Sequence, residues 1–275
     1  MGFRGSPGFT DEWRHFDFEV TDRVATIRLD RTEALNALTL DSYADLRDIF
    51  AELPHAGVAD VIVLTGEGRA FCSGGDVRDI IAELLEADPR KVLDFTRMSS
   101  DVVGNMRRCE LPIIAAVNGL AVGGGAMLAL AADFRIVSTE GSLHFPFTKL
   151  GIAGADMGAI YLLSRMVGLA RTTEILMLGE PLSPADLDRL GLANSVVEPD
   201  ALTAATAELA KRLVEGPTFA YAATKRAITS ELDMDLTAAL EHEATLQALV
   251  MGGEDFGEFH RAYAEKRPPR WTNRR

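Results

Sequence analysis

Three adjacent glycines, Gly123 to Gly125, stand where an apolar strand-like run gives way to a helix rich in alanine and leucine. The segment Leu111–Asp133 reads LPIIAAVNGLAVGGGAMLALAAD. Because glycine loses more conformational entropy on folding than other residues, three in a row indicate that the backbone comes very close to something. A helix that begins there directs unpaired N–H groups and its positive dipole end at whatever lies above the loop. This arrangement suits a carbonyl oxygen that gains negative charge, although tight helix–strand packing without a ligand would use the same glycines.

A second glycine loop follows another apolar run. Val61–Thr65 (VIVLT) is short and continuously apolar, which is typical of a strand covered on both faces. The loop after it, Gly66–Asp76, reads GEGRAFCSGGD and leads into a predicted helix. Two parallel strands with such loops present two sets of N–H donors at the same end of a sheet. One N–H from each loop could therefore hold one oxygen from two sides, as an oxyanion hole does.

Composition narrows the class of protein and its partners. The chain has 275 residues, of which 47% are hydrophobic, so it can bury the core of one large domain. Its formal net charge of −13 argues against nucleic acid, because phosphate binding needs a basic surface. Cys72 and Cys109 lack metal-ligand spacing, so neither a disulfide framework nor a metal site is predicted. Without an apolar run of membrane-spanning length or a signal-peptide core, the sequence predicts a cytoplasmic protein that does not bind membranes.

The order of the predicted elements indicates an α/β fold followed by a helical region. Residues 16–29 alternate as a β-hairpin does, and Thr39 can cap a helix whose apolar face includes Tyr43. Further strands are predicted at 134–138 and 143–147, and helices at 77–86, 89–108, 157–167, 172–178, 202–214, 236–251 and 255–266, with another beginning at Ser183-Pro184. We therefore predict a flexible tail over residues 1–13, a layered core over 14–200 and a C-terminal helical region over 201–275.

Four segments carry a resemblance to a known family. They are RLDRTEALNAL (28–38), VIVLTGEGRAFCSGGDV (61–77), PIIAAVNGLAVGGGAMLALAAD (112–133) and GLANSVVEP (191–199). In this order and at this spacing they resemble the crotonase superfamily, the enoyl-CoA hydratase/isomerase family, over residues 16–271. The resemblance implies an α/β spiral of ββα units with a C-terminal helical trimerisation region, assembled as a homotrimer or a dimer of trimers. It also implies an acyl-CoA thioester as ligand, with coenzyme A as part of the substrate and no tightly bound cofactor.

The resemblance assigns roles to residues by position. The backbone N–H groups of Gly75 and Gly124 would be the donors of the oxyanion hole. The pocket for coenzyme A would include Ala34, Leu35, Ala37, Ala70, Ser73, Asp76 and Val77. Ordinary core packing explains Leu35 and Ala37 equally well, and Asp76 is also suited to capping the helix that follows it.

The sequence departs from the hydratases that it resembles at both of their catalytic glutamates. Met127 and Phe147 stand at these positions, and neither a thioether nor a phenyl ring can exchange protons. Hydration by the usual two-glutamate mechanism is therefore not expected. These two side chains suggest a bulky or aromatic acyl group, and with Ile152 they would form a largely apolar pocket around Asp156.

One carboxylate, Asp156, does stand at a position that the family uses. Arg165 follows nine residues later, and this spacing supports the alignment. By it, Asp156 corresponds to an aspartate that acts as a base in dienoyl-CoA isomerases and as a nucleophile in chlorobenzoyl-CoA dehalogenases. In a largely apolar pocket, desolvation should raise the pKa of Asp156 and suit it to acid–base work near neutral pH. The alternative is that Asp156 only caps a helix.

The favoured hypothesis is double-bond isomerisation of an acyl-CoA, because moving a proton needs only one base and tolerates an apolar pocket. Hydration, hydrolysis or dehalogenation through Asp156 stays open. From another class, the chain could be a non-catalytic acyl-CoA-binding protein, or a structural oligomer without any ligand. Turnover of enoyl-CoA substrates would distinguish the enzyme from the two non-catalytic alternatives. Affinity for coenzyme A would then distinguish the binding protein from the structural oligomer.

Overall fold

The computed structural model describes Trp13 and residues 15–272, and its strands form two sheets. Within these residues, the larger sheet has six strands in the order β1-β2-β3-β5-β7-β9, and the smaller has three in the order β4-β6-β8. The first two strands form the predicted antiparallel hairpin, and the later pairings in both sheets are parallel. The strands are β1 (Asp17–Thr21), β2 (Val24–Leu29), β3 (Val61–Gly66), β4 (Ala70–Cys72), β5 (Ile113–Val117), β6 (Leu120–Val122), β7 (Phe134–Ser138), β8 (Ser142–His144) and β9 (Ser195–Val197).

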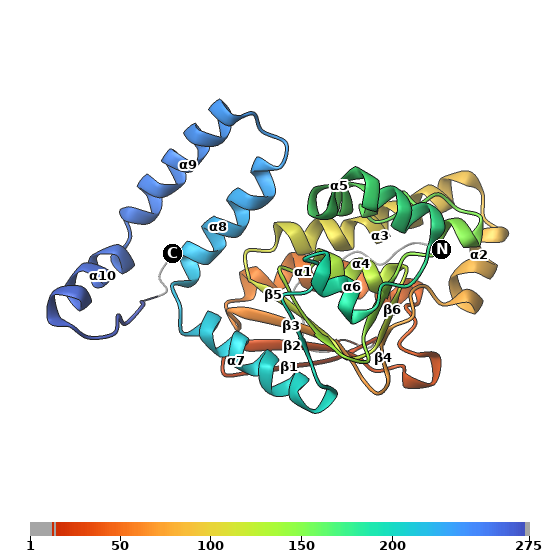
Figure 1. Cartoon of the computed structure of the whole chain (residues 1–275), viewed down its shortest axis with the longest axis horizontal. Helices are drawn as coiled ribbons and strands as arrows, with labels where there is room; N and C mark the ends of the chain where they lie inside the picture. Colours follow the sequence, from red (N-terminus) through yellow and green to blue (C-terminus); the bar gives the residue numbers. More distant parts are fainter. Residues whose placement is uncertain (1–12, 14, 273–275) are drawn as a thin grey trace.

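A repeating unit builds the core: a strand of the larger sheet is followed by a strand of the smaller sheet and by a helix. The unit occurs as β3–β4 with α3 (Pro89–Arg108), β5–β6 with α4 (Gly124–Ala131) and β7–β8 with α5 (Ala159–Leu178). Figure 1 shows the helices of these units on one side of the larger sheet and α7 (Leu202–Val214) on the other. The predicted α/β class and the ββα spiral are therefore confirmed.

Alternation along the buried strands divides their side chains between two cores. Leu64 and Ala115 belong to the larger core, to which α1 (Leu40–Ala56) and α3 contribute. Val63 and Ala116 belong to a smaller core, to which α7 contributes. The apolar run at 61–65 predicts a strand covered on both faces, and the burial of β3 confirms it.

The remaining helices are short or lie beyond the core. They are η1 (Thr32–Ala34), the π-helical η2 (Val77–Ile81), α2 (Ala82–Leu85), η3 (Phe147–Leu150), α6 (Pro184–Arg189), η4 (Pro199–Ala201), α8 (Thr218–Glu231), α9 (Leu236–Met251) and α10 (Glu254–Glu265). The strand predicted at 143–147 is wrong in its second half: β8 ends at His144, and Pro146, which cannot donate to a sheet, precedes η3. The helices predicted at 157–167 and 172–178 form one element, α5, interrupted by non-helical Gly168 at φ 77°.

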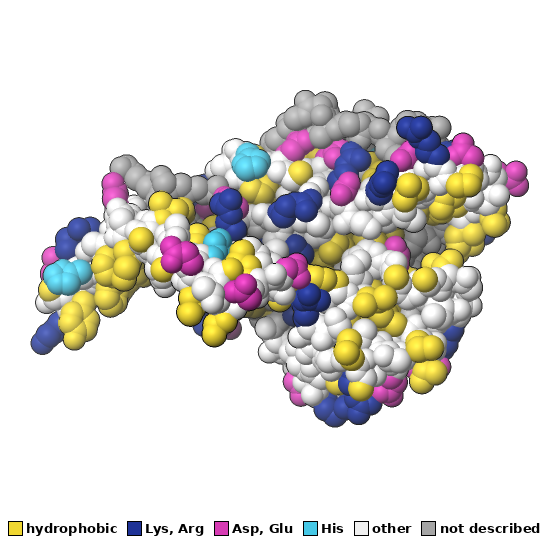
Figure 2. Space-filling view, turned by 90° about the horizontal axis from the view of Figure 1, so that it is seen from above, with side chains coloured by type: hydrophobic (Ala, Val, Ile, Leu, Met, Phe, Trp, Pro, Cys, Tyr) yellow, Lys and Arg dark blue, Asp and Glu magenta, His cyan; other side chains and the backbone are white. Residues whose placement is uncertain are grey.

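The helices α8–α10 form an arm that projects from the core (Figure 1). Lys225 ties α8 to the core, because its Nζ lies 2.7 Å from Asp133 Oδ2 and donates to Leu111 O at 2.8 Å. No residue of α9 is buried, and Figure 2 shows hydrophobic side chains gathered along the arm. Exposed apolar residues of α9 and α10 are Leu236, Leu240, Leu249, Met251, Phe256, Phe259 and Tyr263. Contiguous apolar surfaces of this kind mark interaction sites.

Two predictions of chain organisation are not tested by these observations. The predicted tail over residues 1–13 lies outside the described residues except for Trp13, whose ring stacks on Phe16 with 5.8 Å between the centroids. The boundary at residue 200 stays a prediction; α7, which follows it, packs on the sheet rather than in the arm. In the described part of the chain, no helix combines the length and the apolar character needed to cross a membrane.

The cap of α1 defines the start of the helix that carries Tyr43. Thr39 Oγ1 accepts from the Ser42 N–H at 3.1 Å, and Ser42 Oγ accepts from the Thr39 N–H at 3.2 Å. Thr39→Ala is expected to lower the free energy of unfolding by about 1 kcal/mol, because it removes the acceptor for an N–H at the helix start. In a chain of this size, that lowers the Tm by about 2 °C. Thermal unfolding measures the change, with Thr39→Ser as the conservative control; equal Tm values for Thr39→Ala and wild type would contradict it.

Candidate active site

The two glycine loops predicted to act together lie side by side. The strands that flank them, β4 and β6, pair in a parallel register. Beyond β4, Gly74 has φ +91°, and a Cβ added there would lie 2.7 Å from Val122 O and 3.6 Å from Gly124 N. Glycine alone allows both this conformation and this approach without strain. The first loop therefore packs directly against the start of α4.

The hydrogen bonds between described residues leave both predicted donor N–H groups unused. The Leu38 N–H donates to Gly74 O at 2.7 Å, and Leu38 O accepts from the Asp76 N–H at 2.8 Å. Because successive N–H groups of a bridged, strand-like segment point to opposite sides, the Gly75 N–H faces away from Leu38. It donates to no carbonyl of the described residues. Gly124 is the first residue of α4, so its N–H precedes the first acceptor within the helix.

The hydroxyl of Tyr43 lies at the same place. Its ring stands edge-on to that of Phe95, with 5.7 Å between the centroids. A Cβ added at Gly124 would lie 2.2 Å from Tyr43 Oη, and one added at Gly75 would lie 4.0 Å from it. The hydroxyl therefore sits beside both glycines. The sequence places Tyr43 only on the apolar face of a helix, where a tyrosine is also ordinary core and belongs to no motif. Its position beside the two glycines could therefore not be predicted.

Asp156 reaches the same region from the loop before α5. The next residue is Met157, whose Sδ would lie 3.5 Å from a Cβ added at Gly124. Burial raises the pKa of Tyr43, and the nearby charges of Cys72 and Asp156 raise it further. Burial also raises the pKa of Asp156, while a hydrogen bond from the Met157 N–H offsets part of the effect. The pKa of Asp156 thus shifts in the direction predicted from its apolar surroundings.

Asp156 does not cap α5. The N-cap residue is Gly158, at φ 83° and without a side-chain cap, and the helix begins at Ala159. Only the backbone carbonyl of Asp156 contributes there, by accepting from the Ala159 N–H at 2.8 Å. The alternative that Asp156 serves only as a helix cap is therefore wrong, and its carboxyl group is available for another role.

Hydrogen bonds bring together two of the segments predicted to bind coenzyme A. The Ser73 N–H donates to Leu35 O at 2.9 Å, and the Ser73 hydroxyl donates to Ala34 O at 3.1 Å. Ala70 is buried in β4, immediately before this loop. Residues 34–35 and the first glycine loop therefore form one continuous surface. Their contact with coenzyme A stays a prediction.

Asp76 has structural partners in addition to its predicted ligand. Its carboxylate accepts from Arg31 Nη2 at 2.9 Å and from the N–H groups of residues 78 and 79, which makes it the N-cap of η2. The hydrogen bond from Arg31 and these N–H groups hold the pKa of Asp76 below its usual range. The expectation that Asp76 caps the next helix is confirmed. Arg31 also donates to Ala37 O at 2.6 Å, which ties another predicted coenzyme A residue to this loop. Val77, also predicted to bind coenzyme A, is 65% exposed.

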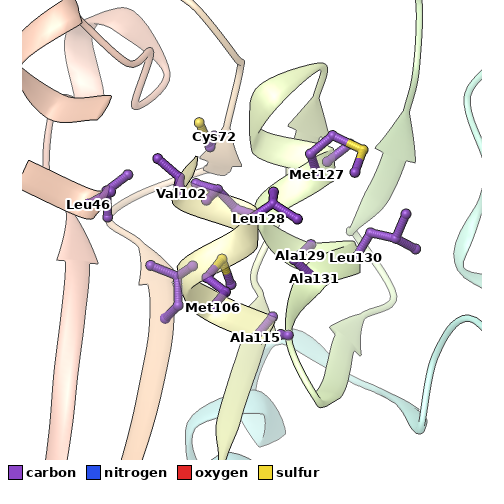
Figure 3. Close-up of a cluster of buried hydrophobic side chains, with 14 of the residues drawn as sticks. Leu46, Cys72, Val102, Met106, Ala115, Met127, Leu128, Ala129, Leu130 and Ala131 are labelled. Atoms are coloured by element: carbon purple, nitrogen blue, oxygen red, sulfur yellow. The ribbon is translucent and has the colours of Figure 1, made fainter. Parts of the chain in front are cut away.

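The three apolar residues predicted to line an acyl pocket differ in exposure. Met127 is fully buried among the core side chains of α4 (Figure 3). Phe147 is 3% exposed, and its Cε1 would lie 3.9 Å from a Cβ added at Gly123. Ile152 is 52% exposed. Phe147 thus borders the second glycine loop, while contact of all three with one acyl group stays a prediction.

A groove of about 900 Å³ lies elsewhere, between the outer face of the larger sheet and α7. Thr26, Val63 and Ala116 line it from the sheet, and Thr206 lines it from α7. It includes none of the predicted site residues, although Gly66 and Gly68, at the start of the first glycine loop, line one end of it. Among the residues that the structure describes, no group of three or more His, Cys, Asp or Glu side chains is placed to hold a metal ion.

Comparison with known proteins defines the class. A model of the family described as "Enoyl-CoA hydratase/isomerase" matches residues 19–274. The chain is 37% identical to a "Probable enoyl-CoA hydratase" of Rhodobacter capsulatus, over 94% of this chain and 97% of that one. It is 32% identical to the 1,2-epoxyphenylacetyl-CoA isomerase of Escherichia coli, over 91% of this chain and 95% of that one. A crystal structure from Streptomyces coelicolor A3(2) is 50% identical, has a TM-score of 0.95 and matches over 100% of both chains.

These matches extend over nearly the whole chain and agree in class. The protein is an acyl-CoA-processing enzyme of the crotonase superfamily. Within that superfamily, the chain belongs to the enoyl-CoA hydratase/isomerase family. The resemblance carried by the four sequence segments is thereby confirmed.

Proposed function

We propose that this protein isomerises double bonds of acyl-CoA thioesters, with Asp156 as the group that moves the proton. The observation that carries the proposal is the position of Asp156, a carboxyl group of raised pKa beside Tyr43 and the start of α4. Met127 and Phe147 support it, because they cannot replace the two glutamates of the hydratases that the chain resembles. A relative named as an isomerase, from Escherichia coli, adds support at 32% identity.

The proposed reaction uses one base and one oxyanion site. The thioester oxygen would accept hydrogen bonds from the N–H groups of Gly75 and Gly124, which stabilise the charge that develops on it. The Asp156 carboxylate removes a proton from the carbon beside the thioester of a 3-enoyl-CoA, and the electron pair moves into a dienolate. The same carboxyl group then returns the proton to the far carbon of the dienolate. The product is the 2-enoyl isomer, with no atom gained or lost.

A panel of acyl-CoA substrates tests the proposal. Purified protein is incubated with 2-enoyl, 3-enoyl and dienoyl-CoA, and the products are identified by mass spectrometry after separation. A product of unchanged mass from a 3-enoyl or dienoyl substrate would support isomerisation. Addition of water to a 2-enoyl-CoA would instead show hydration, which the name of the Rhodobacter capsulatus relative favours. Affinity for acyl-CoA without turnover across the panel would contradict both and indicate a binding protein.

The pH dependence of turnover reports the state of Asp156. The base must be ionised, and burial raises its pKa above the ordinary aspartate value of 3.8. The value of kcat/KM is therefore expected to fall, as pH decreases, at a higher pH than an exposed aspartate would give. Initial rates from about pH 4 to about pH 8 measure this fall in kcat/KM. Circular dichroism over the same range checks that the protein stays folded. Full activity retained down to the ordinary aspartate range would contradict the assignment.

We also propose a homotrimer or a dimer of trimers, as the resemblance implies. The exposed apolar side chains of α9 and α10 support association, since α9 has no buried residue within the chain. Light scattering during size-exclusion chromatography measures the mass in solution. A cytoplasmic location, coenzyme A as part of the substrate and the lack of a tightly bound cofactor belong to the same proposal.

A further inference from the structure

The surroundings of Tyr43 hold its side chain in one place. Tyr43 is 3% exposed and lies in the larger core, where its ring stands edge-on to Phe95. It projects from α1, whose first turn is fixed by the cap at Thr39. A buried aromatic ring packed in this way has little freedom to move its hydroxyl. The position of the Tyr43 hydroxyl is therefore a fixed feature of the site.

The hydroxyl points at the two glycines and has no partner of its own. Tyr43 Oη would lie 2.2 Å from a Cβ added at Gly124 and 4.0 Å from one added at Gly75. It makes no hydrogen bond to another described residue. The oxygen is not completely enclosed, so a molecule bound in the site can reach it. The polar group of a side chain as buried as Tyr43 ordinarily has a hydrogen-bond partner, in the protein or in a bound molecule. An unpaired one beside two unused N–H groups is explained if all three meet the same acceptor.

We propose that Tyr43 is a third hydrogen-bond donor to the thioester oxygen, beside the N–H groups of Gly75 and Gly124. This inference rests on the proposed function, because it needs a thioester in that position. A fixed hydroxyl adds to the stabilisation of an enolate without reorganising during the reaction. Tyr43 is thus a catalytic residue that the four sequence segments do not contain.

The electrostatic surroundings favour a donor over a base at this position. Burial raises the pKa of the Tyr43 hydroxyl, and the charges that Cys72 and Asp156 carry at the high pH where Tyr43 would ionise raise it further. Tyr43 therefore keeps its proton at neutral pH and can donate it in a hydrogen bond. Burial also raises the pKa of the Cys72 thiol to about 12, so that group stays neutral as well. Proton removal is left to Asp156.

The kinetic test removes only the hydroxyl. Tyr43→Phe is expected to lower kcat for double-bond migration by about 10²-fold, as loss of one oxyanion donor does, with little change in KM. Tyr221→Phe is the matched control, because Tyr221 Oη would lie 2.3 Å from a Cβ added at Gly216, in the same relation to a glycine but outside the site. Equal kcat values for Tyr43→Phe and Tyr221→Phe would overturn the proposal.

A spectroscopic test separates this proposal from the proposed function. The stretching frequency of the thioester carbonyl is measured by isotope-edited infrared spectroscopy for carbonyl-labelled crotonyl-CoA bound to wild type, Tyr43→Phe and Tyr221→Phe. We expect a lower frequency on wild type than in water, and a smaller shift on Tyr43→Phe alone. Equal shifts on all three proteins would overturn the role of Tyr43 while leaving the glycine donors in place. No shift on wild type would overturn both, because there would be no polarised oxygen for any donor to hold.

Discussion

Replacing Asp156 with asparagine is expected to reduce kcat for double-bond migration by about 10²–10⁴-fold, the usual contribution of a positioned acid–base group. Asparagine is nearly isosteric with aspartate but cannot accept a proton from carbon. The affinity for acyl-CoA should change little, because the predicted coenzyme A residues lie in other segments. Steady-state rates with a 3-enoyl-CoA, together with calorimetric binding of the same ligand, measure the two effects separately.

The stability of this variant distinguishes a lost base from a damaged fold. Burial raises the pKa of Asp156 above its unfolded value, so its ionised form destabilises the native state at pH 7. That destabilisation is absent below the pKa of Asp156 in the unfolded chain. It grows as the pH rises from there and is complete above the raised pKa of the native state. Asp156→Asn should therefore be at least as stable as wild type at pH 7, and the difference should vanish in acid. Asp200→Asn, an exposed carboxylate in η4, is the matched control for kcat. Wild-type turnover by Asp156→Asn would remove Asp156 from the mechanism.

Gly124→Ala is expected to lower kcat by about 10²–10³-fold, comparable with the loss of an oxyanion-hole donor. The new Cβ would lie 2.2 Å from Tyr43 Oη and 3.3 Å from Cζ, so the ring must shift and the hydroxyl must leave its place beside the two N–H groups. The fold should suffer less than it would from a clash with backbone, because the atom in the way is the end of a side chain, although the packed ring must shift to make room. Rates and thermal unfolding of the same preparation measure both effects.

The neighbouring glycine provides the contrast. A Cβ added at Gly125 would lie 2.2 Å from Cys72 O and 2.6 Å from Cys72 Cβ, which are backbone and near-backbone atoms that cannot turn aside. Gly125→Ala should therefore destabilise the fold by about 1–3 kcal/mol, as overpacking does. Combining Gly124→Ala with Tyr43→Phe is expected to cost less than the sum of the two single losses, because the collision with the hydroxyl is gone. Strictly additive losses would show that Gly124→Ala does not act through Tyr43.

Local motifs carried most of what could be predicted about the site. The glycine loops, the cap at Thr39 and the cap at Asp76 each depend on residues close together in the chain, and the structure places them as expected. Most strands of the larger sheet could also be predicted, because β3, β5 and β7 are largely apolar runs bounded by turns, whereas the three-residue β9 was missed. Such features need no knowledge of distant contacts.

Features that depend on distant contacts were missed or wrong. The strands β4 and β6 have three residues each, too few for a periodic pattern, and they lie inside the glycine loops. The helix α8 has only Ala222 and Lys225 buried, so it shows no apolar stripe. The alternative that Asp156 only caps a helix is wrong because Gly158, at φ 83°, is the N-cap of α5. Tyr43 was missed because only the packing of α1 against both loops gives its hydroxyl a role.

Double-bond migration in heavy water tests the central claim most directly. A 3-enoyl-CoA is incubated in D₂O with wild type and with Asp156→Asn, and the position of the double bond and of the deuterium is followed by NMR. The account predicts a 2-enoyl product with no added hydroxyl group, formed about 10²–10⁴ times more slowly by Asp156→Asn. A hydrated product from wild type, or equal rates of migration with the two proteins, would contradict it.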